Sequence, residues 1–150
     1  MAVHRVVIEH LSHAHKINQL SHMIVLISFL VTFIVARTLT YLQNANLFPQ
    51  NTTNPHIHHL VPGIILLLIS GYSAISFWSN SKLHLIMSAI FGIGAALTLD
   101  EFALWLLLRD VYWEEQGRLS IDAVIIVLTI LVITYLSGLV EISRRKAISS

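Results

Sequence analysis

The chain has 150 residues, enough for one domain, and only 11% of them are charged, against about 25% in an ordinary soluble domain. Because 55% of the residues are hydrophobic and the mean hydropathy is +0.74, the composition excludes a small soluble fold. The net charge of +1 argues against a nucleic-acid partner, and the absence of cysteine excludes disulfides and thiolate metal sites. Nine histidines are unusual in a chain with so little charge.

The N-terminal segment, residues 1–18, is predicted to form a short amphipathic helix on the inner membrane surface. Its apolar residues recur at helical spacing, at Val3, Val7, Leu11 and Ala14. We interpret the histidines of this region as a solvated polar face, with intracellular metal or proton sensing as the alternative. These histidines are His4, His10, His13, His15 and His22.

Four long apolar stretches follow, and they predict an all-α membrane protein with a bundle of four transmembrane helices. Asp, Glu, Lys and Arg are absent from residues 17–36, 38–81, 83–99 and 123–140. Since a bilayer core needs about 20 apolar residues as helix, we expect spans at residues 20–42, 61–78, 83–108 and 121–142. Membrane strands would be shorter and would alternate in polarity. The whole chain, residues 1–150, is predicted to be a single membrane domain.

The basic residues orient these spans. Six of them fall on one side of a four-span topology: Arg5, Lys16, Lys82, Arg144, Arg145 and Lys146. The positive-inside rule then predicts a multi-pass protein of the plasma membrane with both termini cytoplasmic. The lipid bilayer is therefore the first expected partner, and the loops at residues 43–54 and 109–120 are expected outside.

Unexpected polar residues converge in the outer half of the predicted bundle. Asp100 and Glu101 lie inside the third span. Carboxylates within a membrane cost much free energy, and they usually mark a functional site. The second and third spans form a hairpin around Ser81, so Pro62 is level with Asp100. Histidines therefore stand within one or two turns of both acids, at His56, His58 and His59. Arg37 on the first span lies at a similar depth.

Imidazoles and carboxylates without cysteine suit a divalent transition metal such as Zn, Fe or Mn. We expect His56, His58 and His59 to supply nitrogen ligands, and Asp100 or Glu101 to supply an oxygen ligand. Two adjacent acids rarely both face one metal, so the other acid would support the ligands or pair with Arg37. The alternatives are wet interfacial histidines and a purely structural ion pair between the acids and Arg37.

Four further polar residues are expected to flank the site. Arg37 fits a structural counter-ion better than a catalytic group, and Asp122 is typical of the acids that open a helix. Asp110 and Glu114 belong to a charged segment, residues 109–118, between the last two spans. This segment is either a lid over the histidines or a solvated connector.

Three functions fit these features. The leading hypothesis is a metal-binding membrane protein, and an open coordination position facing water would make it a metal-dependent enzyme, although the sequence indicates no substrate. The first alternative is a proton or metal-cation channel or transporter, which with four spans needs an oligomer, such as a dimer through the Gly92 and Gly94 face. The second alternative is a structural or partner-binding membrane protein whose polar residues lock the bundle.

Several short runs together resemble a family of small four-span prokaryotic integral membrane proteins. These runs are His56-Ile57-His58-His59, Leu99-Asp100-Glu101-Phe102-Ala103-Leu104-Trp105-Leu106, Asp110-Val111-Tyr112-Trp113 and Gly117-Arg118-Leu119-Ser120-Ile121-Asp122-Ala123. They cover roughly the half of the chain from the second span to the start of the fourth. The resemblance implies a prokaryotic plasma-membrane protein and assigns no activity, substrate or site residues.

Overall fold

The computed structural model of the protein describes residues 2–45, 58–77, 80–109 and 114–149. Its helices are α1 (Ala2–Asn44), α2 (Leu60–Ser76), α3 (Ser81–Asp100), α4 (Phe102–Leu107) and α5 (Arg118–Ser149), with a short 3-10 helix η1 (Glu115–Gly117) before α5. No strand occurs among the described residues, so the all-α class is confirmed.

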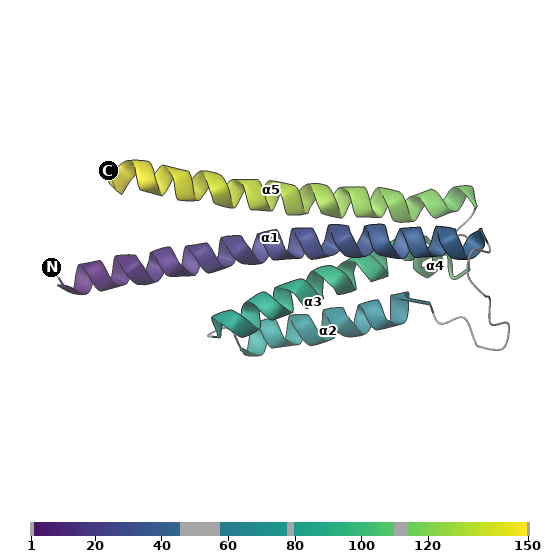
Figure 1. Ribbon diagram of the computed structural model, residues 1–150, viewed down its shortest axis with the longest axis horizontal. Helices are drawn as coiled ribbons and strands as arrows, with labels where there is room; N and C mark the ends of the chain where they lie inside the picture. Colours follow the sequence, from purple (N-terminus) through teal and green to yellow (C-terminus); the bar gives the residue numbers. More distant parts are fainter. Residues whose placement is uncertain (1, 46–57, 78–79, 110–113, 150) are drawn as a thin grey trace.

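Three helices are long and apolar enough to cross a membrane: Ala14–Gln43 within α1, Ser81–Asp100, and Arg118–Arg144 within α5. The second predicted span, residues 61–78, corresponds to α2, which is apolar but has only 17 residues. Figure 1 places the two ends of the chain at the same end of the molecule, where α1 and α5 extend past the α2–α3 hairpin. The prediction of an all-helical protein with apolar helices long enough to cross a membrane is therefore confirmed for three of the four predicted spans.

The N-terminal segment is not a separate helix. Instead of an amphipathic helix over residues 1–18 followed by a span, α1 is one helix of 43 residues. The reason lies in its sequence, since no Gly or Pro occurs between Ala2 and Asn44 to break or kink the backbone. At 1.5 Å per residue α1 is roughly 65 Å long, which exceeds the hydrocarbon thickness of a bilayer of about 30 Å.

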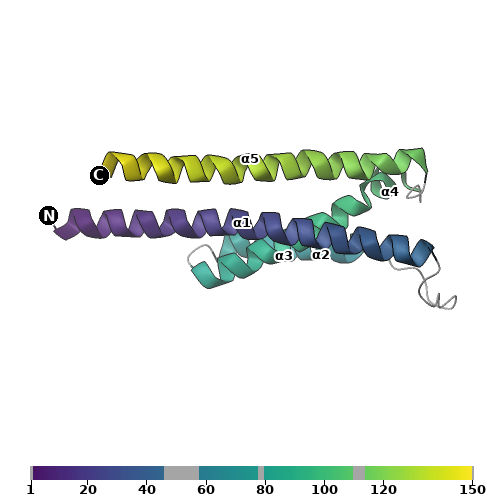
Figure 2. The same cartoon turned by 45° about the horizontal axis from the view of Figure 1, so that its top comes forward.

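The third predicted span also differs from expectation, because it breaks at Glu101. The backbone of Glu101 has φ −105° and ψ 23°, so α3 ends at Asp100 and the short helix α4 starts in a new direction (Figure 2). The predicted continuous helix over residues 83–108 is therefore divided into two. Leu108 ends α4 in the left-handed region, with φ 52°.

The helix α3 lies at the centre of the packing and contacts both α1 and α2, while α5 runs beside α1 (Figures 1 and 2). Glycines allow the closest approaches. A Cβ on Gly94 would lie 2.9 Å from the carbonyl oxygen of Gly63 on α2, and a Cβ on Gly92 would lie 2.6 Å from the carbonyl oxygen of Val25 on α1. Both α3 glycines are buried inside the chain, so they are not the exposed dimer face that the transport hypothesis expected.

The close α1–α3 contact yields a test of the packing. We expect Gly92→Ala to destabilise the protein by about 1–3 kcal/mol, because overpacking forces two helix backbones apart. The matched control is Gly71→Ala on α2, where nothing lies within 4 Å of the added Cβ. Replacement of an open helical glycine by alanine should be neutral or slightly stabilising. Unfolding in detergent micelles, followed by circular dichroism, measures both changes, and equal stabilities would contradict the packing described.

Candidate functional site

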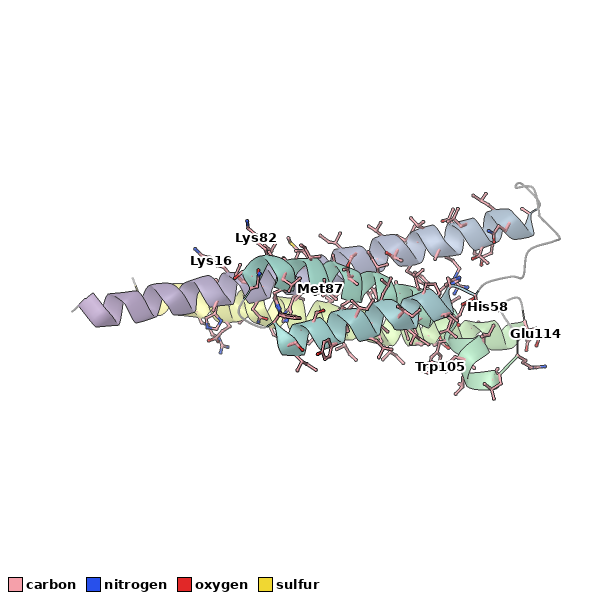
Figure 3. All side chains as sticks on the ribbon, turned by 90° about the horizontal axis from the view of Figure 1, so that it is seen from below. Lys16, His58, Lys82, Met87, Trp105 and Glu114 are labelled. Atoms are coloured by element: carbon pink, nitrogen blue, oxygen red, sulfur yellow. The ribbon has the colours of Figure 1, made fainter. Side chains whose placement is uncertain are left out.

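Five of the predicted site residues meet at one end of the bundle. Arg37 comes from α1, His58 and His59 directly precede α2, and Asp100 and Glu101 occupy the α3–α4 break. We call these five residues the ionisable cluster and this end of the molecule the cluster end. Figure 3 shows His58 at this end of α2, and Lys82 at the opposite end of the hairpin.

Asp100 is the centre of the ionisable cluster and is 0% exposed. Its Oδ1 forms an ion pair with Nη2 of Arg37, and its Oδ2 lies 2.9 Å from Nε2 of His59. Nη2 of Arg37 also donates to the backbone carbonyl of Asp100 at 3.3 Å, and the guanidinium stacks over Phe33 at 5.4 Å. A buried carboxylate is thus compensated by cationic or donor groups from two other segments, as a charge in a low-dielectric interior requires.

Glu101 bonds to the start of α2. The backbone N–H of Leu60 donates to its Oε2 at 2.7 Å, and Nδ1 of His58 lies 2.9 Å from its Oε1. The N-cap of α2, His59, makes no side-chain cap bond, so a carboxylate from a different helix satisfies an N–H that helix starts leave open. The negative charge also lies at the positive end of the α2 dipole, where it is stabilising.

His59 lies between the two acids. Its Nε2 is 2.9 Å from Asp100 and its Nδ1 is 3.6 Å from Oε1 of Glu101. This residue precedes α2 and lies outside the helices long enough to span a membrane. Burial lowers the pKa of His59, but the hydrogen bond to Asp100 and the charges of Glu101 and Asp100 outweigh burial and the repulsion by Arg37, so the pKa is raised above its ordinary value. His59 therefore keeps a proton at pH values at which an exposed histidine has lost it.

All four carboxylate oxygens of Asp100 and Glu101 thus face donors that the protein itself supplies. Among the residues that the structure describes, no three His, Cys, Asp or Glu are grouped so that they could hold a metal ion. In the described geometry, each of the two carboxylates is therefore paired with cationic groups or N–H donors of the protein.

The remaining predicted residues divide into two groups. His56 and Asp110 lie outside the described residues. Glu114 and Asp122 are described and exposed. Glu114 forms an ion pair at 3.2 Å with Arg109, and within the described part of the chain Asp122 forms no ion pair with the ionisable cluster.

Two contacts near the site were not predicted. The first is the Leu60 N–H, because a backbone donor leaves no trace in the sequence. The second is the hydroxyl of buried Ser120 on α5, which accepts from the backbone N–H of Ala103 at 2.9 Å and fixes the first turn of α4. The spacing of Ser120 in the sequence could not indicate that it has a partner on another helix.

Below the ionisable cluster, the buried hydroxyls serve their own helices. Ser70 donates to the carbonyl of Leu66 at 2.7 Å, and Thr98 donates to that of Gly94 at 2.8 Å. Hydroxyls bonded in this way can be buried between membrane helices without a partner across the interface.

Comparison of the chain with models of protein families, with curated proteins and with solved structures finds no match. The resemblance to small four-span membrane proteins therefore stays a prediction.

The Arg37–Asp100 pair yields a second test. We expect Arg37→Met to destabilise the protein by about 3–5 kcal/mol, because it leaves a buried carboxylate without its cation. The double variant Arg37→Met with Asp100→Leu should recover much of this loss, since it removes both charges. Arg109→Met is the matched control, because the Arg109–Glu114 pair is exposed and should contribute about 0–1 kcal/mol. The free energy of unfolding in micelles is measured for the double variant and for both single variants. A similar loss of stability in Arg37→Met and Arg109→Met would contradict the role assigned to Arg37.

Proposed function

We propose that this chain is an integral membrane protein in which the ionisable cluster works as a structural lock. It joins the ends of α1, α2 and α3 in one register and so presents a fixed helical surface to the bilayer and to membrane partners. One observation carries the proposal: each of the four carboxylate oxygens of Asp100 and Glu101 faces a donor from another segment of the chain.

The energetics favour a lock at this position. Charged groups in a membrane protein are tolerated where they pair with one another inside the bundle, and removal of one member leaves the others uncompensated. A shift of one helix along its neighbours therefore costs free energy. A shift of α3 by one turn would move Asp100 away from Arg37 and Glu101 away from Leu60 together. Apolar contacts in lipid discriminate less between registers, because lipid tails are as apolar as the side chains.

The contact between Glu101 and Leu60 tests the lock directly. We expect Glu101→Ala to raise amide exchange in the first turn of α2 by roughly 10- to 100-fold, because a buried N–H loses its acceptor. Glu115→Ala is the matched control, since Glu115 is exposed. Hydrogen exchange in micelles, read by mass spectrometry, measures the effect. Unchanged exchange around Leu60 in the Glu101 variant would overturn the lock.

A second candidate is binding of a divalent transition metal such as Zn, Fe or Mn, and the imidazole–carboxylate pairs favour it. In metal sites a ligating histidine usually donates its second ring N–H to a carboxylate, which fixes the tautomer. The pair between Nδ1 of His58 and Glu101 has this geometry, with Nε2 as the atom that would ligate. In this reading Glu101 and Asp100 orient imidazoles rather than bind the ion themselves.

Metal analysis of untagged protein distinguishes the two candidates. The metal hypothesis expects about one ion per chain after loading with Zn, Mn or Fe, a large loss of bound metal in His58→Gln, and a lower melting temperature with a chelator. The structural-lock proposal expects no bound metal and no change of the melting temperature with a chelator. His84→Gln, at the other end of α3, is the matched control. Metal content far below one ion per chain under all loading conditions would remove the second candidate.

We further propose four membrane crossings with both termini in the cytoplasm and the cluster end outside the plasma membrane. Both chain ends lie together (Figure 1), and Lys16 and Lys82 lie away from the cluster end (Figure 3), as the positive-inside rule favours. The 17 residues of α2 measure about 25 Å as a helix, which a locally thinned bilayer can accommodate.

Because the chain has no cysteine, single cysteines report its topology cleanly. We expect a membrane-impermeant maleimide to label Glu115→Cys in intact cells, and Lys82→Cys only after permeabilisation. Both positions are exposed. The reverse pattern would invert the orientation, and labelling of both in intact cells would contradict the crossings by α2 and α3.

A further inference from the structure

The short helix α4 and the residue after it carry a strongly exposed apolar patch at the cluster end. Trp105 is 53% exposed, Leu106 is 57% exposed and Leu108 is 88% exposed. We call these three side chains the α4 patch. It lies beyond Asp100, the last residue of the apolar span formed by α3, so the crossing of the membrane by α3 does not account for it.

The opposite side of α4 is fixed to the rest of the protein. Ala103 is buried, and its N–H donates to the hydroxyl of Ser120 on α5 at 2.9 Å. The N–H of Trp105 bonds to the carbonyl of Glu101, the N-cap of α4, at 3.2 Å, and this bond closes the first turn of α4. The α4 patch is therefore the exposed part of a helix whose buried residue, Ala103, is held against α5.

The residues that follow the α4 patch mark a polar boundary. Arg109 comes directly after Leu108 and pairs with Glu114 at 3.2 Å, and both side chains are at least half exposed. An exposed ion pair of this kind belongs in water or among lipid headgroups. Tryptophan with flanking leucines, beside charged residues, is the composition that settles at the interface between hydrocarbon and headgroups. Figure 3 shows Trp105 and Glu114 at the same end of the molecule.

We propose that the α4 patch is a lipid-contacting surface that seats α4 in the interfacial layer of the bilayer at the cluster end. This inference rests on the proposed membrane insertion of the chain. It adds a statement of how deep the ionisable cluster lies in the bilayer. The membrane boundary runs between Leu108 and Arg109. Glu101 and Asp100 then lie on the membrane side of that boundary, where their oxygens have to pair with groups that the protein supplies.

Depth-dependent fluorescence quenching tests the α4 patch. The chain has three tryptophans, so the variant Trp78→Phe with Trp113→Phe leaves Trp105 as the single reporter. In phosphatidylcholine vesicles we expect strong quenching by lipids brominated high on the acyl chain, and weak quenching by aqueous acrylamide. Two reporters on a background without other tryptophans calibrate depth: Glu114→Trp for the aqueous side and Ile130→Trp, at an exposed position midway along α5, for the hydrocarbon core.

Two outcomes would overturn the inference. Acrylamide quenching of Trp105 equal to that of Glu114→Trp would place α4 in water. Protection from both quenchers would mean that protein, such as a second copy of the chain, covers the patch. In either case, strong bromolipid quenching of Ile130→Trp would show that the membrane insertion itself still holds.

A second readout avoids dependence on the tryptophan. A nitroxide attached at Leu106→Cys, in the cysteine-free chain, should be more accessible to oxygen than to a water-soluble nickel chelate. The reverse ratio would overturn the inference. Glu115→Cys supplies the aqueous reference.

Discussion

A carboxylate that is cut off from water must find its hydrogen-bond donors inside the protein, and Asp100 imposes this condition on the whole molecule. The donors come from Arg37 of α1 and from the residue before α2, so the end of α3 and the start of α2 have to lie level with Arg37. The helix break follows from the same condition. An uninterrupted α3 would carry Glu101 about 100° around the helix from Asp100, whereas the break lets its carboxylate reach the first N–H of α2.

The break also arranges the helix dipoles in a favourable way. The positive start of α2 meets the negative charge of Glu101, and the negative end of α3 meets the guanidinium of Arg37 through the carbonyl of Asp100. Backbone and side-chain charges therefore stabilise one another in the same small volume. The glycine contact between Gly63 and Gly94 brings the two helices close enough for these bonds to form. Packing and electrostatics at the cluster end are thus two parts of one arrangement.

Much of this arrangement follows from the sequence, and the rest does not for identifiable reasons. Charge-free runs predicted the helices, and the hairpin around Ser81 correctly brought His58 and His59 to Asp100 and Glu101. The break at Glu101 was missed because no Gly or Pro marks it, and the partner of the Glu101 carboxylate lies 41 residues away in the sequence. The continuity of α1 was missed because a change from polar to apolar residues was interpreted as a boundary, although it does not alter helix propensity. The direct pairing of the acids with protein donors depends on side-chain directions, which residue spacing does not fix.

The helix α1 is much longer than the α2–α3 hairpin against which it packs. A helix without Gly or Pro bends little, and α1 continues well beyond the end of the α2–α3 hairpin (Figure 1). Its far end is anchored at Arg37, and Gln19 bonds to the carbonyl of Tyr135 on α5 at 2.9 Å along the way. The part of α1 that extends past the hairpin therefore has no support from α2 or α3 (Figure 1), and its position depends on the contacts that α1 makes with α3 and α5 further along the helix.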